Sequence, residues 1–253
     1  RLLDACADAG VRKIVYTSSS AIFGVPESNP VTEETPPVPG EAYGRAKLAG
    51  EKLCRESRSS GLDVTIVRPR TILGHGRLGI FQTLFEWIHK GQNIPVLGAG
   101  DNVYQFVHAD DLARACMAAG EREGPAVYNI GAETYGTMRS ALEALVAHAG
   151  TKSRVRSVPM WLAVAAMKAT TALGLSPLGP YHALMYGRSL YFDISAAKRD
   201  LQWSPRFGND EMLAESYDWY GRHRDDILAG RLYGSKHRSA VEEGALALLK
   251  YVL

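Results

Sequence analysis

The amino-acid sequence predicts an α/β protein built around a parallel sheet. Two short runs rich in β-branched and aromatic residues, 12–19 and 62–69, alternate with longer stretches that have helical spacing. A third apolar run at 126–131 follows another helical stretch, and this alternation is typical of βαβ units. The later part of the chain alternates less regularly, so we expect it to form a smaller α+β domain.

Each expected element follows from a local pattern. Residues 1–10, RLLDACADAG, indicate a helix that ends at Gly10 and has no N-cap before it. The chain is therefore expected to begin inside an element, as a fragment of something longer. The expected strands cover 12–19, 62–69, 102–108, 126–131 and 154–159. The further expected helices cover 41–61, 80–91, 109–121, 136–150 and 209–227, and an amphipathic tail helix covers 235–253. One more helix is expected to begin at Asp193 or Ser195 and to end before Pro205.

Composition excludes several classes of protein. With 29 basic and 27 acidic residues, the formal charge of +2 gives no basic field for nucleic acid, so no nucleic-acid partner is expected. Cys6, Cys54 and Cys116 are far apart, and they indicate neither a disulfide framework nor a metal site. A reducing cytoplasm is the simpler interpretation of these cysteines.

The most apolar stretch, 158–179, is interrupted by Lys168, Gly174 and Pro177. A membrane-spanning helix needs about 20 largely uncharged residues. We therefore expect no transmembrane segment, and a buried or membrane-surface helix at this place. Peripheral membrane contact stays open as an alternative.

Polar side chains follow the ends of two predicted strands. Thr17, Ser18, Ser19 and Ser20 end the first strand, and Arg68-Pro69 ends the second. The carboxyl ends of parallel strands are where open sheets hold their ligands. Between them, Tyr43 and Lys47 are four residues apart, which places both side chains on one face of the expected helix.

Four segments in this order resemble the extended short-chain dehydrogenase/reductases, the NAD-dependent epimerase/dehydratase group. They are VYTSSSAIFG, YGRAK, IVRPRTILGHG and FVHADDLARA, and the resemblance covers about residues 1–220. It implies a Rossmann-type doubly wound parallel sheet, of which this chain holds the C-terminal part. It also implies NAD or NADP as cofactor, a small-molecule substrate and a homodimer.

The resemblance implies a role for individual residues. Tyr43 is the acid/base, Lys47 lowers its pKa and holds the nicotinamide ribose, and Ser19 orients the substrate, with Ser18 and Ser20 as the alternatives for that serine. The residues implied to line the cofactor are Thr17, Ser18, Tyr43, Lys47, Pro69, Arg70, Thr71 and Ile72. Those expected near the substrate are Ser20, His75 and Tyr104.

The electrostatics of this pair agree with such a role. A free tyrosine titrates near 10, so its pKa must fall by about three units for it to act as a base near pH 7. This change corresponds to about 4 kcal/mol of free energy. One ammonium group about 4 Å away, at an effective dielectric of about 20, supplies energy of that order.

The sequence departs from the family pattern in the phosphate-binding region. The loop G-x-x-G-x-x-G and the residue that reads the adenosine ribose are both absent. A second hypothesis of another class therefore stands beside the first, that the chain is a non-catalytic binding module or an inactive fragment.

Two further departures bear on the substrate. Nucleotide-sugar members usually carry an asparagine where Thr71 stands and an arginine where Tyr104 stands, and 161–178 is strongly apolar. We therefore expect hydride transfer at a secondary alcohol or ketone of an apolar, steroid-like substrate, as in the 3β-hydroxysteroid dehydrogenase branch. A nucleotide-sugar epimerase or dehydratase is the alternative.

The predicted domain organisation follows from these motifs. Residues 1–78 and 103–132 form the remaining part of the NAD(P)-binding domain, and 79–102 with 133–230 form the substrate-binding domain. Residues 231–253 form a C-terminal tail helix.

Overall fold

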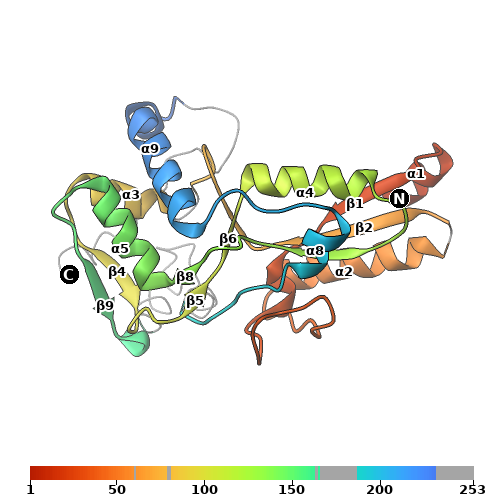
Figure 1. Ribbon diagram of the computed structural model, residues 1–253, viewed down its shortest axis with the longest axis horizontal. Coiled ribbons are helices and arrows are strands. Elements are labelled where there is room, and N and C mark those ends of the chain that lie inside the picture. The colour runs from red at the N-terminus through yellow and green to blue at the C-terminus, as the bar shows by residue number, and fades with distance from the viewer. Residues whose placement is uncertain (60, 79–80, 163–164, 166–186, 232–253) are drawn as a thin grey trace. The chain divides into compact units, whose positions relative to one another are not determined.

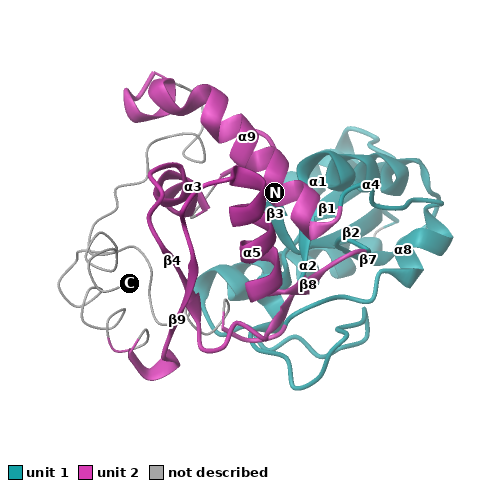
Figure 2. Cartoon of the chain, turned by 60° about the vertical axis from the view of Figure 1, so that its left-hand side comes forward, with its two compact units in different colours: residues 1–72, 105–133, 190–207 teal, residues 73–104, 134–189, 208–253 magenta. Residues whose placement is uncertain are grey.

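The computed structural model divides the chain into two compact units, and it describes residues 1–59, 61–78, 81–162, 165 and 187–231. Unit 1 consists of Arg1–Ile72, Gln105–Glu133 and Leu190–Phe207, and unit 2 of the remaining segments. Both units are coloured in Figure 2. The predicted tail helix and most of 158–179 lie outside the described residues.

Unit 1 contains a parallel three-stranded sheet in the order β1-β2-β7. Its strands are β1 (Lys13–Thr17), β2 (Asp63–Pro69) and β7 (Val127–Ile130). Tyr16 is opposite Ile66, and Ile66 is opposite Val127. These runs pair in parallel because apolar side chains on both faces of the sheet can be buried under helices.

Helices cover both faces of this sheet. Helix α2 (Ala42–Arg58) packs against β2 on one face, and α4 (Ala109–Glu121) packs against β1 and β2 on the other (Figure 1). The buried side chains Cys54, Leu62, Val64 and Ile66 form part of the core between α2 and the sheet. This layering confirms the predicted α/β fold class.

Smaller elements complete unit 1. They are α1 (Leu2–Asp8), the 3-10 helix η1 (Ser20–Phe23), β6 (Phe106–His108) and α8 (Ser195–Asp200). Strand β3 (Thr71–Leu73) pairs with β6. His108 caps α4, because its Nδ1 accepts a hydrogen bond from the backbone N–H of Asp110 at 3.2 Å.

The segment Leu190–Phe207, expected in the second domain, packs in unit 1. The indole N–H of Trp203 donates to the carbonyl oxygen of Asp111 at 3.0 Å. The buried carboxylate of Asp111 accepts from the backbone N–H groups of Arg206 and Phe207 at 2.9 and 3.2 Å. These contacts hold the segment on the first turn of α4.

The described part of unit 2 includes two short strand pairs and three helices. Strand β4 (Ile94–Leu97) runs parallel to β9 (Val155–Val158), and β5 (Val103–Tyr104) runs antiparallel to β8 (Gly136–Thr137). Its helices are α3 (Phe81–His89), α5 (Met138–Ala149) and α9 (Asn209–Leu228), and α9 packs against the other two. Among the described residues, no helix has both the length and the apolar character that crossing a bilayer requires.

The expected strand over 102–108 is two strands, β5 and β6, that are interrupted at Gln105. The Gln105 side chain is fully buried and donates to the carbonyl oxygen of Ala132 at 2.7 Å. It also accepts from the backbone N–H of Phe192 at 2.9 Å. Gln105 therefore forms side-chain bonds to two distant segments at the place where the strand is broken.

Candidate active site

The serine side of the candidate site begins where β1 ends at Thr17. Ser18 continues the pairing with β2, since its backbone N–H donates to the carbonyl oxygen of Val67 at 2.7 Å. Ser19 is the N-cap of η1, and its Oγ accepts a hydrogen bond from the backbone N–H of Ala21 at 3.2 Å. This bond uses an acceptor lone pair, so the single proton of the Ser19 hydroxyl stays available for donation.

Tyr43 and Lys47 stand on the first two turns of α2. The Lys47 ammonium donates to the carbonyl oxygen of Thr17 at 2.9 Å. Its Nζ lies 5.9 Å from the ring centroid of Tyr43 and 5.4 Å from that of Tyr16. Tyr43 is 54% exposed, so its hydroxyl is accessible to a small molecule.

The third part of the site is the end of β2. Pro69 is the last residue of that strand, and the backbone N–H of Arg70 donates to the carbonyl oxygen of Ile130 at 2.9 Å. The Arg70 side chain is buried, and its Nη1 donates to Ser20 Oγ at 2.8 Å. Thr71 and Ile72 are half-buried in β3.

A buried ion pair connects α2 to β2, and the sequence analysis missed it. Glu51 lies one turn beyond Lys47 and is fully buried, and its two carboxylate oxygens accept from Arg68 Nε and Nη2 at 2.9 and 2.7 Å. Burial alone raises the pKa of the Glu51 carboxyl, but the hydrogen bonds and charge of Arg68 outweigh it and hold that pKa below its ordinary value. The i, i+4 spacing places Glu51 on the same helix face as Lys47, but no local pattern indicates its partner Arg68, which lies 17 residues away.

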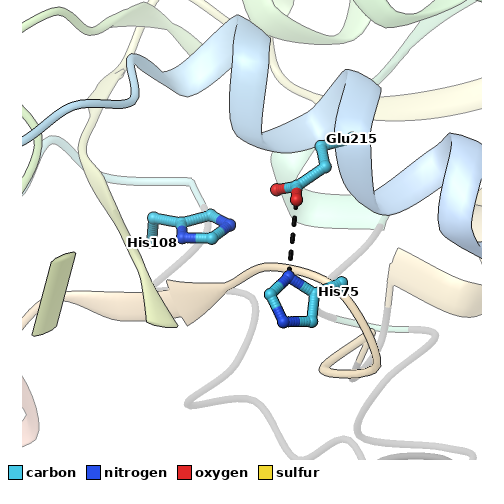
Figure 3. A group of neighbouring side chains, drawn as sticks. All are labelled: His75, His108 and Glu215. Carbon is cyan, nitrogen blue, oxygen red and sulfur yellow. Dashed lines mark hydrogen bonds and ion pairs between the residues drawn. The ribbon is translucent and has the colours of Figure 1, made fainter. Parts of the chain in front are cut away.

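Two expected substrate residues, His75 and Tyr104, belong to unit 2, so their part in the site stays a prediction. His75 is exposed, and its Nδ1 lies 3.4 Å from the Oε1 of Glu215 on α9 (Figure 3). Tyr104 is buried, and its carbonyl oxygen accepts from the side-chain amide of Asn209 at 2.6 Å.

Unit 1 therefore brings together most of the predicted site residues. Thr17, Ser19 and Lys47 lie at the carboxyl end of β1, and the neighbouring strand β2 ends at Pro69. One sheet edge therefore carries an exposed phenol, an ammonium and a hydroxyl donor. Together these groups can bind the hydroxyl of a small molecule and exchange a proton with that hydroxyl.

Comparisons with known proteins identify relatives of this chain. It is 55% identical over all of its 253 residues to an uncharacterised protein, y4nG, of Sinorhizobium fredii, and it spans 63% of that relative's length. It is 26% identical over 248 residues to UDP-glucose 4-epimerase 4 of Oryza sativa, covering 88% of this chain and 61% of the relative.

Among solved structures, the chain is similar to MoeE5 in complex with UDP-glucose and NAD. The TM-score is 0.68 at 26% identity, over 88% of this chain and 69% of that one. The family model described as the NAD dependent epimerase/dehydratase family matches residues 1–131, which is more than half of the chain. The chain belongs to the NAD-dependent epimerase/dehydratase family.

Proposed function

We propose that this chain carries the reaction centre of an NAD(P)-dependent epimerase or dehydratase that acts on a nucleotide sugar. The observation that carries the proposal is the arrangement of Tyr43 and Lys47 on α2, with the Lys47 ammonium bonded to the carbonyl oxygen of Thr17. Ser19 follows Thr17 by two residues, so a proton donor, an ammonium and an exposed phenol serve one strand end.

In this proposal each side chain has a separate task. Tyr43, as the phenolate, takes the proton from a hydroxyl on the reacting carbon and becomes a neutral phenol, and Lys47 stabilises the phenolate before this transfer. Ser19 donates its hydroxyl proton to the same substrate oxygen, because the bond from the N–H of Ala21 uses an acceptor lone pair and leaves that proton available. Reversal of these steps returns the proton to the oxygen.

The residues of unit 1 fit the nicotinamide and ribose end of NAD or NADP. An ammonium has three N–H donors, and Thr17 engages one of them in Lys47. When bound, the dinucleotide would supply the hydride acceptor and donor. The residues that would hold it are Thr17, Ser18, Tyr43, Lys47 and the segment from Pro69 to Ile72.

The comparisons favour a nucleotide sugar over the steroid-like substrate that the sequence analysis preferred. The rice relative is named a UDP-glucose 4-epimerase, and MoeE5 was solved with UDP-glucose and NAD. The apolar preference depended on Thr71, Tyr104 and the stretch 161–178, most of which lies outside the described residues. For the choice of substrate, the lack of two expected diphosphate-binding residues is weaker support than similarity to relatives over most of this chain.

The direct test is turnover by the gene product that contains this chain. UDP-glucose and UDP-glucuronic acid with NAD are followed by proton NMR of the anomeric signals, and a hydrophobic secondary alcohol is run in parallel. Epimerised or dehydrated nucleotide sugar is expected, and Tyr43→Phe is expected to abolish it. Reduction of NAD by the apolar alcohol alone would restore the steroid-like assignment.

A non-catalytic binding module or an inactive fragment is the second candidate. It is favoured by the absence of any G-x-x-G-x-x-G in the 253 residues, since that loop binds the pyrophosphate in nucleotide-binding folds. Calorimetry of the 253-residue chain with NAD and NADP separates the two hypotheses. Micromolar binding that Lys47→Met weakens would support the catalytic assignment.

We also propose a homodimer that forms through α2. Ala46, Ala49 and Leu53 are exposed at i, i+3 and i+7 on this helix, and Leu53 is 58% exposed. Light scattering after size exclusion tests it. Leu53→Glu is expected to shift a dimer to the monomer mass, whereas Leu228→Glu, at an exposed leucine of unit 2, is expected to leave the mass unchanged.

A further inference from the structure

A buried arginine follows β2 and reaches the serine side of the site. Arg70 is 2% exposed, and its Nη1 donates to Ser20 Oγ at 2.8 Å. Arginines are rarely buried to this degree without a specific partner. Ser20 is the residue next to Ser19, so the guanidinium acts one residue away from the hydroxyl assigned to the substrate.

The surroundings of Arg70 fix its guanidinium in place. The guanidinium carbon lies 5.7 Å from the ring centroid of Phe192, within the range of a cation–π contact. The Phe192 ring is itself buried, and the backbone N–H of Phe192 donates to the fully buried Gln105 amide. Gln105 in turn donates to the carbonyl oxygen of Ala132. Arg70 therefore contacts the ring of Phe192, whose backbone is hydrogen-bonded through Gln105 to Ala132, just after the end of β7.

The helix η1 links Ser20 to two parts of the site, the strand end that carries Ser19 and the helix that carries Tyr43. Toward the strand, Ser19 caps η1 through the N–H of Ala21. Toward the catalytic helix, a Cβ added to Gly44 would lie 2.3 Å from the carbonyl oxygen of Ala21. The backbone next to Tyr43 is thus in direct contact with η1, and a displacement of η1 changes the positions of both Ser19 and Tyr43.

From these contacts we infer that Arg70 is a positioning residue for the reaction centre. By holding Ser20, it fixes η1 and so sets the separation between the Ser19 hydroxyl and the Tyr43 phenol. This inference rests on the proposed function, because it assigns a task to Arg70 within that site. In this role the Arg70 guanidinium acts through Ser20, and only the Arg70 backbone belongs to the segment proposed to line the cofactor.

The test separates the local effect of Arg70 from its effect on stability. Arg70→Met removes the donor and keeps the length, Ser20→Ala removes only the acceptor, and Arg70→Lys retains a charged donor. Arg58→Met is the matched control, because Arg58 is another arginine of unit 1, and its guanidinium donates to the carbonyl oxygens of Val64 and Ala126. Arg58 bonds at the other end of the sheet and has no part in the site.

Two readouts are made on the gene product. Hydrogen exchange of the peptide 18–25 is expected to quicken about tenfold in Arg70→Met and in Ser20→Ala, and to stay unchanged in Arg58→Met. The kcat for the nucleotide sugar is expected to fall about 10- to 100-fold with little change in KM, since a small misplacement costs rate more than binding. Arg70→Lys is expected to recover part of the slow exchange and part of kcat. The double variant Arg70→Met with Ser20→Ala is expected to have a kcat no lower than that of Arg70→Met.

Two results would overturn the inference. One is unchanged exchange of 18–25 in both Arg70→Met and Ser20→Ala, and the other is an additive loss of kcat in the double variant. Ser20→Ala keeps Arg70 and the core intact, so it gives an answer even where Arg70→Met does not fold. Absence of turnover in the wild type would contradict the proposed function instead, and the exchange result would still decide whether Arg70 fixes η1.

Discussion

The Lys47 ammonium donates to the carbonyl oxygen of Thr17 at 2.9 Å, and this bond joins helix α2 to the end of β1. A second bond lies beside it, from the Tyr16 hydroxyl to the carbonyl oxygen of Lys47 at 3.3 Å. Lys47 is therefore held at both its backbone and its side chain by two consecutive residues of β1. The lysine is fixed before any ligand arrives, which is the preorganisation that electrostatic catalysis requires.

Lys47→Met tests this arrangement. Methionine keeps the unbranched chain and removes the charge, so we expect the kcat for the nucleotide sugar to fall at least about 100-fold. The matched control is Lys52→Met on the same helix, because Lys52 is exposed and pairs only loosely with Glu56 at 3.9 Å. Steady-state kinetics measure both variants. Full activity of Lys47→Met would rule out its assigned role.

Gly44→Ala tests the contact between α2 and η1. The new Cβ would lie 2.3 Å from the carbonyl oxygen of Ala21, so one of the two backbones must move. We expect a loss of about 1–3 kcal/mol in the free energy of unfolding. Gly221→Ala in the interior of α9 is the control, since nothing lies within 4 Å of its added Cβ.

In that control the substitution is expected to stabilise the protein by about 0.5–1 kcal/mol, because alanine is the better helix former. Urea unfolding gives both values. Equal effects of the two substitutions would contradict the close approach at Gly44.

Most of the fold could be predicted from the sequence because its strands and helices differ in period. The strand expected at 62–69 is observed as Asp63–Pro69, and the helix expected at 136–150 as Met138–Ala149. Strands β3, β4 and β8 were missed, since they are short and have no alternating pattern long enough to read. Their existence depends on partners distant in the sequence.

The candidate site could be predicted only in part for the same reason. Tyr43 and Lys47 stand out because they share a helix face, but the partner of Glu51 is Arg68, on a strand 17 residues away. Arg70 was expected along the nicotinamide, and its backbone position at the end of β2 agrees with that. Which way its side chain turns depends on Ser20 and Phe192, and no local pattern encodes those contacts.

Glu51→Gln tests the buried ion pair beneath α2. It leaves the charge of Arg68 buried without its carboxylate, so we expect a loss of about 3–5 kcal/mol in the free energy of unfolding. Glu56→Gln, in the exposed pair with Lys52, is expected to change that free energy by less than about 1 kcal/mol.

The double variant Glu51→Met with Arg68→Met adds a second check. It removes both charges together, so we expect it to be more stable than Glu51→Gln. A double variant that is less stable than Glu51→Gln would show that the ion pair stabilises the fold by more than the cost of leaving the Arg68 charge buried and unpaired. Urea unfolding of the three proteins decides between these results.

The last prediction concerns acid stability, which depends on Glu86 in unit 2. Its carboxylate accepts from Tyr220 at 2.5 Å, from Nε and Nη2 of Arg224 at 2.7 Å each, and pairs with Lys90 at 2.8 Å. Burial alone raises the pKa of Glu86, but the hydrogen bonds from Arg224, Lys90 and Tyr220 outweigh it and lower that pKa to about 2.

Because the folded-state pKa lies below the ordinary value of 4.5, the carboxylate stabilises the fold fully above pH 4.5, and this contribution is lost as the pH falls toward 2. We expect the loss to be about 3 kcal/mol by pH 2. Urea unfolding of the wild type and of Glu86→Gln between pH 2 and 6, followed by tryptophan fluorescence, measures it. The wild type is expected to be the more stable at pH 6, with a difference that shrinks toward pH 2 because protonation makes its side chain neutral, like glutamine. Parallel pH profiles would mean that Glu86 does not bind its partners as a carboxylate.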